Sequence, residues 1–235
     1  MTPVVLLAHG SPDPRSSQDT TELAARVAAR SGRIVVPAFL DNNQPDLTAA
    51  VSELGAQGFT SAFVLPAFLS HAFHVRVDIP AAVVEAGEET GVALTVVDPL
   101  GPAPELLDAL DSALPAGPAV LATAGTSNVG AQWDFEQLAR TWSKRRGAPV
   151  LVAYASQAKP DVPTAISELE GITGQQVSVG SFVLFQGVLP DRIANSAGDR
   201  PCTQPLCSSD VLTDLIVDRI QALSLEVAPT VMVNA

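Results

Sequence analysis

The sequence predicts an α/β fold made of two tandem lobes, each with a parallel sheet, and a cleft between the lobes. Short β-branched runs alternate with helical patterns along the chain, which is typical of parallel strands connected by helices. The runs are apolar at successive positions, as expected for strands that helices cover on both faces. The chain also aligns with itself at a constant offset, which indicates that the α/β unit occurs twice.

Strands are expected where apolar, often β-branched residues form short runs. In the first copy these are residues 4–8 (VVLLA), 33–37 (RIVVP), 61–66 (SAFVLP) and 93–97 (ALTVV). In the second copy they are residues 119–123 (AVLAT), 149–154 (PVLVAY) and 177–184 (VSVGSFVL). Helical periodicity lies between the strands, at residues 19–30, 46–57, 80–90 and 105–114, and Pro80 is suited to the first turn of its helix.

The internal repeat has an offset of 115 residues. Gly10 aligns with Gly125, Asp46 aligns with Asp161, and the tripeptide Ser-Glu-Leu occurs at residues 52–54 and 167–169. The Pro- and Gly-containing segment 114–118 is suited to a boundary, so the predicted lobes are residues 1–115 and 116–235, both flavodoxin-like. Near its end the second copy is shorter, and its counterpart of residues 93–97 reads DRPCT, which suits a strand edge or a loop.

Composition excludes several classes of function. The formal net charge is −12, which argues against non-specific nucleic-acid binding and against docking on an anionic membrane. The apolar start, residues 4–8, is far shorter than the ~20 residues of a membrane span and lacks the flanks of a signal peptide. We therefore expect a cytoplasmic protein. The two cysteines, Cys202 and Cys207, are too few for a disulfide framework or for a cluster held by one chain.

The chain has three histidines, all in the first copy. His9 and His74 follow the first and third expected strands, and Asp41 follows the second, so all three belong to the carboxyl edge of one parallel sheet. In the second copy their counterparts are Ala124, Leu189 and Ser156, which indicates an active copy and a degenerate one. Two imidazoles and a carboxylate can hold a divalent metal with open positions, and imidazoles can equally accept protons near neutral pH.

Three motifs resemble those of the class II chelatases, in particular the long, internally duplicated sirohydrochlorin chelatases. They are LLAHGSPDP, AFLDNNQPDL and VLPAFLSHAFHVRVDIP, and LFQGVLPDRI resembles the degenerate second half of that family. The resemblance implies insertion of Fe²⁺ or Co²⁺ into sirohydrochlorin, a tetrapyrrole, by a lyase of sirohaem or cobalamin biosynthesis. It implies that His9 and His74 bind the metal and accept pyrrole protons, with Asp41 beside them.

On this interpretation the metal is a substrate, no cofactor is permanently bound, and Fe²⁺ is favoured because sirohaem serves sulfite and nitrite reduction. The partners are the tetrapyrrole and the metal, without nucleic acid or membrane, and a monomer can complete the cleft because both lobes lie in one chain. The residues expected to contact the tetrapyrrole are Ser11, Arg15, His71, Arg76, Gly187, Leu189 and Arg192. Arginine is suited to ligand carboxylates, Gly187 to close backbone approach and Leu189 to apolar contact.

Two other functions stay open at this point. A metal-storage or metallochaperone protein would use the same His and Asp residues without catalysis. Two α/β lobes also suit a periplasmic small-ligand binding protein, although no signal peptide is evident. A Walker A pattern is absent from the sequence, which disfavours a phosphate-binding NTPase.

Overall fold

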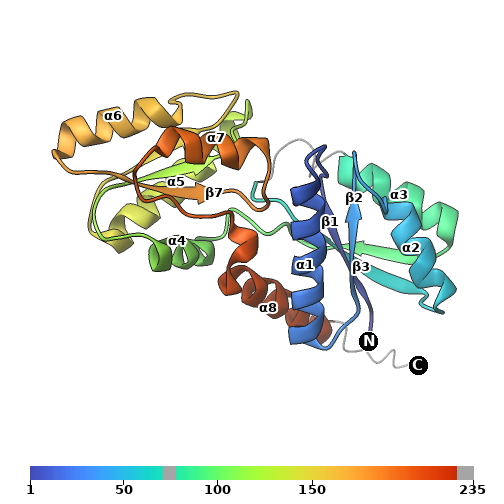
Figure 1. Ribbon diagram of the computed structural model, residues 1–235. Helices are drawn as coiled ribbons and strands as arrows, with labels where there is room; N and C mark the ends of the chain where they lie inside the picture. Colours follow the sequence, from blue (N-terminus) through green and yellow to red (C-terminus); the bar gives the residue numbers. More distant parts are fainter. Residues whose placement is uncertain (71–77, 227–235) are drawn as a thin grey trace.

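The computed structural model describes residues 1–70 and 78–226, which form two α/β lobes lying next to each other (Figure 1). The first lobe holds a four-stranded sheet in the order β2-β1-β3-β4, with β1 at Val4–Ala8, β2 at Val35–Phe39, β3 at Ser61–Pro66 and β4 at Ala93–Val96. The second holds a three-stranded sheet in the order β6-β5-β7, with β5 at Ala119–Thr123, β6 at Val150–Tyr154 and β7 at Ser178–Phe182. All of these strand pairs are parallel, so the predicted fold class is confirmed.

Helices cover the sheets. They are α1 Pro14–Ser31, α2 Leu47–Ala56, α3 Ile79–Thr90, α4 Leu107–Ala113, α5 Val129–Arg146, α6 Val162–Thr173, α7 Val188–Ala197 and α8 Asp210–Glu226, with short 3-10 turns η2 Pro104–Leu106 and η3 Leu206–Ser208. Alternate residues of β1 enter different cores: Val4 and Leu6 belong to one buried cluster, and Val5 and Leu7 to another. Because both faces of the strand are buried, its sequence is apolar at every position.

Aspartates fix where several helices begin. Asp13 accepts the backbone N–H of Arg15 at 3.0 Å, and Pro14 occupies the first helical position, so α1 begins five residues before the predicted range 19–30. Asp46 and Asp161 cap α2 and α6 in the same way, each accepting the N–H three residues later, at 2.8 and 3.0 Å. The Asp13 cap thus makes α1 begin before the first residue of its apolar periodicity.

The backbone reproduces the internal repeat. Gly10 and Gly125 have φ of +93° and +102°, and the non-glycine residues Asn42 and Gln157 both have φ of +61°. A backbone N–H···O bond of 2.7 Å joins residue 43 to Asp41, and its counterpart of 2.7 Å joins residue 158 to Ser156. In the second copy a fourth strand is replaced by an isolated bridge between Val179 and Cys202, as the sequence DRPCT indicated.

The last helix of each copy packs on the opposite lobe. In Figure 1, α4 lies beneath the second sheet and α8 lies beside α1 of the first lobe. Leu110 of α4 and Trp142 of α5 both approach Gly180 of β7, where an added Cβ would lie 3.0 and 2.5 Å from them. Arg30 of α1 pairs with Asp210 and Asp214 of α8 at 2.9 and 2.6 Å. The final helix of each predicted lobe, residues 1–115 and 116–235, therefore packs on the other lobe. The boundary between the lobes stays a prediction that rests on the internal repeat.

In the described part of the chain, no helix combines the length and apolar character that crossing a membrane requires.

Candidate active site

A cavity of about 470 Å³ lies where the carboxyl ends of the two sheets face each other. Residues 9–12 and 67–70 line it from the first lobe, and residues 123–126 and 182–190 line it from the second. Its size falls within the ~300–1,000 Å³ typical of small-molecule sites. Each lining loop directly follows a parallel strand, so the fold itself brings these loops to one place.

The cavity is mostly apolar. Phe68 and Leu184 contribute side chains from the two lobes, and Phe135 and Phe182 stack edge-on with ring centroids 6.2 Å apart. Such a lining suits the flat, conjugated face of a ligand. Phe135 and Phe182 were not predicted as site residues, because they occupy ordinary buried positions of α5 and β7, and Phe68 lies in the loop after β3.

His9 lies at the rim of this cavity, in the loop after β1. Its side chain is exposed, and its ring contacts Phe68 edge-on at a centroid distance of 6.4 Å. Gly10 allows the loop to touch the loop after β2, since a Cβ on Gly10 would lie only 1.8 Å from the carbonyl oxygen of Asp41. The Asp41 N–H also donates to the His9 carbonyl at 2.9 Å. The His9 and Asp41 loops are therefore in direct backbone contact.

Of the other residues predicted for the metal site, Asp41 lies among the described residues and His74 does not. Asp41 is exposed, and its carboxylate accepts the N–H of Asn42 at 2.7 Å. His74, His71 and Arg76 lie outside the described residues, so the predicted His9–His74–Asp41 set stays a prediction. Among the residues that are described, no group of three or more His, Cys, Asp or Glu side chains could hold a metal ion.

Ser11 is held in the His9 loop by two hydrogen bonds. Its N–H donates to Oδ1 of Asn43 at 2.7 Å, and its Oγ accepts the N–H of Asp13 at 3.1 Å. Asn43 therefore fastens the His9 loop to the Asp41 loop. The sequence did not single out Asn43; its only signal was its place two residues after Asp41 in a turn-forming segment.

Gly187 and Leu189 line the cavity from the second lobe. Gly187 is buried, with φ of +150°, and a Cβ built on it would lie 3.9 Å from Cβ of Asp13 and 4.0 Å from Oγ of Ser11. The two walls thus approach each other closely at this end of the cavity. A direct contact of Gly187 or Leu189 with ligand stays a prediction.

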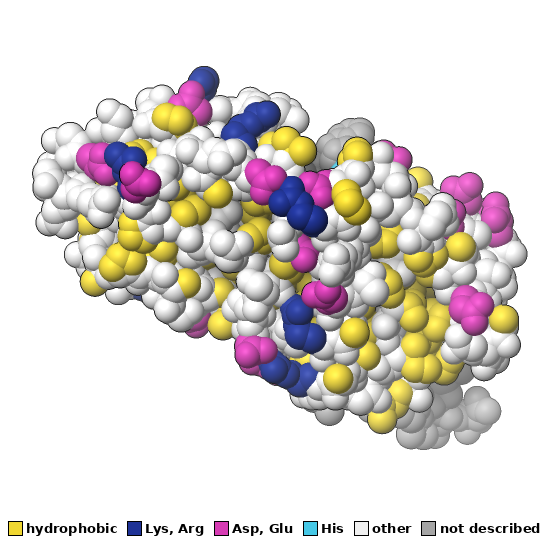
Figure 2. Space-filling model, viewed as in Figure 1, with side chains coloured by type: hydrophobic (Ala, Val, Ile, Leu, Met, Phe, Trp, Pro, Cys, Tyr) yellow, Lys and Arg dark blue, Asp and Glu magenta, His cyan; other side chains and the backbone are white. Residues whose placement is uncertain are grey.

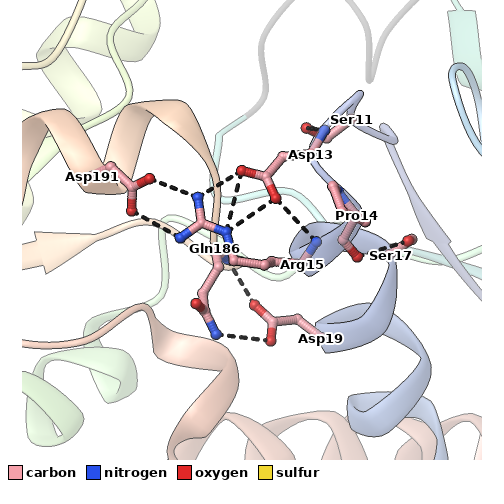
Figure 3. A network of polar contacts seen from close by, with 8 residues as sticks. All are labelled: Ser11, Asp13, Pro14, Arg15, Ser17, Asp19, Gln186 and Asp191. Carbon is pink, nitrogen blue, oxygen red and sulfur yellow. Dashed lines mark hydrogen bonds and ion pairs between the residues drawn. The ribbon is translucent and has the colours of Figure 1, made fainter.

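The predicted carboxylate-binding arginines have protein partners. Arg15 bonds to Asp13 and to Asp191 of α7, and these carboxylates raise the pKa of its guanidinium while Arg15 lowers the pKa of Asp13 (Figure 3). Arg192 donates to the carbonyl of Ala155 at 2.9 Å and borders a separate groove on α7. On the face shown in Figure 2, blue basic side chains lie next to magenta acidic ones.

A buried carboxylate, Asp19 of α1, also reaches the second lobe. It accepts the backbone N–H of Gln186 at 2.7 Å and the side-chain amide of Gln186 at 3.3 Å (Figure 3). Burial, reinforced by the negative charge of Asp19, raises the pKa of the Cys207 thiol to about 12. Cys207 is thus a protonated, unreactive thiol at neutral pH, and both it and Cys202 are free.

Comparison with known proteins gives one family. The CbiX family model matches residues 3–116 and again residues 118–223, in agreement with the two copies of the repeat. The chain is 31% identical over 78 residues to the sirohydrochlorin cobaltochelatase of Methanosarcina barkeri, which covers 33% of this chain and 60% of that protein. It is 30% identical over 110 residues to the chloroplastic sirohydrochlorin ferrochelatase of Arabidopsis thaliana, covering 46% of this chain and 49% of that protein.

Among solved structures, SirB from Bacillus subtilis with Fe³⁺ superposes with a TM-score of 0.78 at 20% identity, covering 94% of this chain and 95% of that one. At this identity the likeness is one of fold. It extends over both lobes, including their relative arrangement.

Proposed function

The chain belongs to the CbiX family, and we propose that it inserts a divalent metal ion, Fe²⁺ or Co²⁺, into sirohydrochlorin. The observation that carries this proposal is the apolar cavity between the lobes, with His9 at its rim on one side and Ala124 at the equivalent position on the other. A planar macrocycle can lie between the two walls with its metal-binding face toward His9. The metal is a substrate in this reaction and is not a resident cofactor.

The proposed chemistry follows from what the macrocycle must lose. Two pyrrole N–H protons leave as one divalent ion enters, so the site needs a weak metal ligand and a proton acceptor. A neutral imidazole serves both purposes near pH 7. We propose that His9 and His74 deliver the metal and receive the protons, and that Asp41, whose loop touches that of His9, supplies negative charge beside them.

Because the protein has a net charge of −12, a substrate rich in carboxylates needs positively charged side chains close to the site. Arg76 and Arg192 stay proposed contacts for those carboxylates. Arg15 stays a candidate too: its Nε, Nη1 and Nη2 atoms all donate to Asp13 or Asp191, and these bonds leave one Nη1–H for a ligand carboxylate.

We favour Fe²⁺ as the substrate metal, and relatives are named for each metal: the Methanosarcina protein for cobalt and the Arabidopsis protein for iron. Imidazole and carboxylate ligands accept both ions, so the residue types do not separate them. Insertion rates with each metal, measured on the same protein under anaerobic conditions, decide between Fe²⁺ and Co²⁺.

The test is the absorbance change of sirohydrochlorin with metal, with and without the protein. We expect insertion clearly faster than the spontaneous rate. Asp41→Asn should slow it, whereas Ser156→Ala, the same position in the second copy, should not. Metal binding without any acceleration would instead establish the metallochaperone alternative.

A further inference from the structure

The second lobe is fastened to the first by a bridge of charged side chains at one end of the cavity. Arg15 of α1 donates to Oδ1 and Oδ2 of Asp191 in the first turn of α7, at 3.2 and 2.6 Å. The same guanidinium donates to Oδ1 and Oδ2 of Asp13, at 3.0 and 2.6 Å (Figure 3). The fork thus joins two carboxylates from different lobes with bidentate geometry, which fixes orientation as well as distance.

From Asp13 the hydrogen bonds continue into the His9 loop. The Asp13 N–H donates to Ser11 Oγ at 3.1 Å, and the Ser11 N–H donates to Asn43 Oδ1 at 2.7 Å. The loop of Asn43 is bonded to His9 through the Asp41 N–H, which donates to the His9 carbonyl at 2.9 Å. A continuous set of contacts therefore runs from α7 of the second lobe to the backbone of His9.

The Arg15–Asp191 pair of this bridge lies outside the cavity and is about half exposed to solvent. Ser11 and Gly187 line the cavity from opposite sides, whereas Arg15 and Asp191 do not line it. A second tie, from Asp19 to Gln186, holds the other end of the wall segment 186–191 to the same helix α1. The two ties together set the separation between the His9 loop and the second lobe.

Among the described residues, the other side of the pseudo-symmetric cavity holds no counterpart of this bridge. At the repeat offset of 115, Arg15 corresponds to Gly130, which has no side chain to form an ion pair, and Asp191 corresponds to Arg76. The bridge therefore accompanies the copy that carries His9.

We propose that Asp191 of the second lobe is a positioning residue, which acts through Arg15 and Asp13 to hold the His9 loop in its metal-binding geometry. The degenerate lobe, which has lost the histidines and the carboxylate, thereby contributes to the site of the other lobe. The metal readout of this inference rests on the proposed function, because it uses metal held by His9.

The experiment compares Asp191→Asn with Asp214→Asn. Asp214 also pairs with an arginine of α1, Arg30 at 2.6 Å, and it is similarly exposed, but it lies at the other end of that helix. Co²⁺ affinity of the tetrapyrrole-free protein is titrated by absorbance. Since exposed ion pairs contribute up to ~1 kcal/mol, we expect Asp191→Asn to weaken Co²⁺ binding about three- to fivefold and Asp214→Asn less than about twofold. Asp191→Glu, which keeps the carboxylate, should restore most of the affinity.

A metal-independent readout keeps this test separate from the proposed function. The Ser11 amide resonance should shift in Asp191→Asn and stay in place in Asp214→Asn, whether or not the protein binds Co²⁺. If His9→Ala leaves Co²⁺ affinity unchanged, the proposed metal site fails, and the amide shift alone decides the bridge. Equal behaviour of the two Asn variants in both readouts overturns the proposal. So does a lower KM for sirohydrochlorin in Asp191→Asn with unchanged Co²⁺ affinity and Ser11 resonance, because Asp191 would then merely compete with ligand for Arg15.

Discussion

Replacing Gly10 with alanine separates the two loops that carry His9 and Asp41. The new Cβ would lie 1.8 Å from the Asp41 carbonyl oxygen, at a φ of +93° that side chains rarely adopt. The left-handed conformation costs ~1–2 kcal/mol, and losing the Asp41–His9 backbone bond costs ~1 kcal/mol more. We therefore expect Gly10→Ala to lower the free energy of unfolding by about 2–3 kcal/mol.

The second copy supplies a matched control. A Cβ on Gly125 would lie 1.9 Å from the Ser156 carbonyl oxygen at a φ of +102°, so Gly125→Ala should cost about the same stability in urea unfolding. Metal insertion should nevertheless fall ~10²-fold in Gly10→Ala, the scale for moving a reacting group by ~1 Å, and change little in Gly125→Ala. Equal loss of insertion in the two variants, with both folded, would refute the division into an active and a supporting copy.

Three further outcomes are expected. His9→Ala, and by the sequence prediction His74→Ala, should each slow insertion at least ~10²-fold while the unfolding transition stays in place, because the second copy tolerates Ala124; a single-turnover assay measures the rate, and full activity would contradict the role. Insertion should fall as pH drops below ~6, where imidazoles become protonated and lose their metal-binding lone pair; a flat rate from pH 5 to 8 would exclude histidine from both tasks. Hydrogen bonds from Arg200, at 2.7 and 2.8 Å, hold the pKa of Glu170 below its usual range, so the stability that Glu170→Gln removes should be fully present above the unfolded-state value of ~4.3 and be lost as pH falls from there through the lowered folded-state pKa; urea midpoints of both proteins measured from neutral to acid pH test it, and equal midpoints at neutral pH would contradict the pairing.

Strands were predictable where burial dictates their residues. The predicted ranges 4–8, 61–66 and 119–123 agree with β1, β3 and β5 at both ends, because each is a mostly apolar run that is buried on both faces. The range 33–37 is two residues too early, since β2 continues through Pro37 to Phe39. Pro37 has no N–H to donate, but β2 is an edge strand, where the missing bond is tolerated.

The position of His9 at the carboxyl edge was predictable, because His9 directly follows a strand of a parallel sheet. The partners of the arginines were not predictable in this way. Arg15 and Asp191 are 176 positions apart, and nothing in either local sequence indicates that α7 lies against the start of α1. The exchange of final helices could not be predicted for the same reason: the sequences of α4 and α8 resemble each other and do not indicate which lobe each helix covers.

That exchange means that neither copy of the repeat is closed by itself. A fragment ending near residue 115 would lose α8, whose Leu212, Ile216 and Ile220 are fully buried. A half-length ancestor with the same topology would have covered its core only by lending its last helix to a twin and receiving one in return, as reciprocally swapped homodimers do. Within one chain the two halves need not be identical, so the loops at the carboxyl edge of one sheet can differ from those of the other. Each half still depends on the other for its last helix, and the two must therefore fold as one unit.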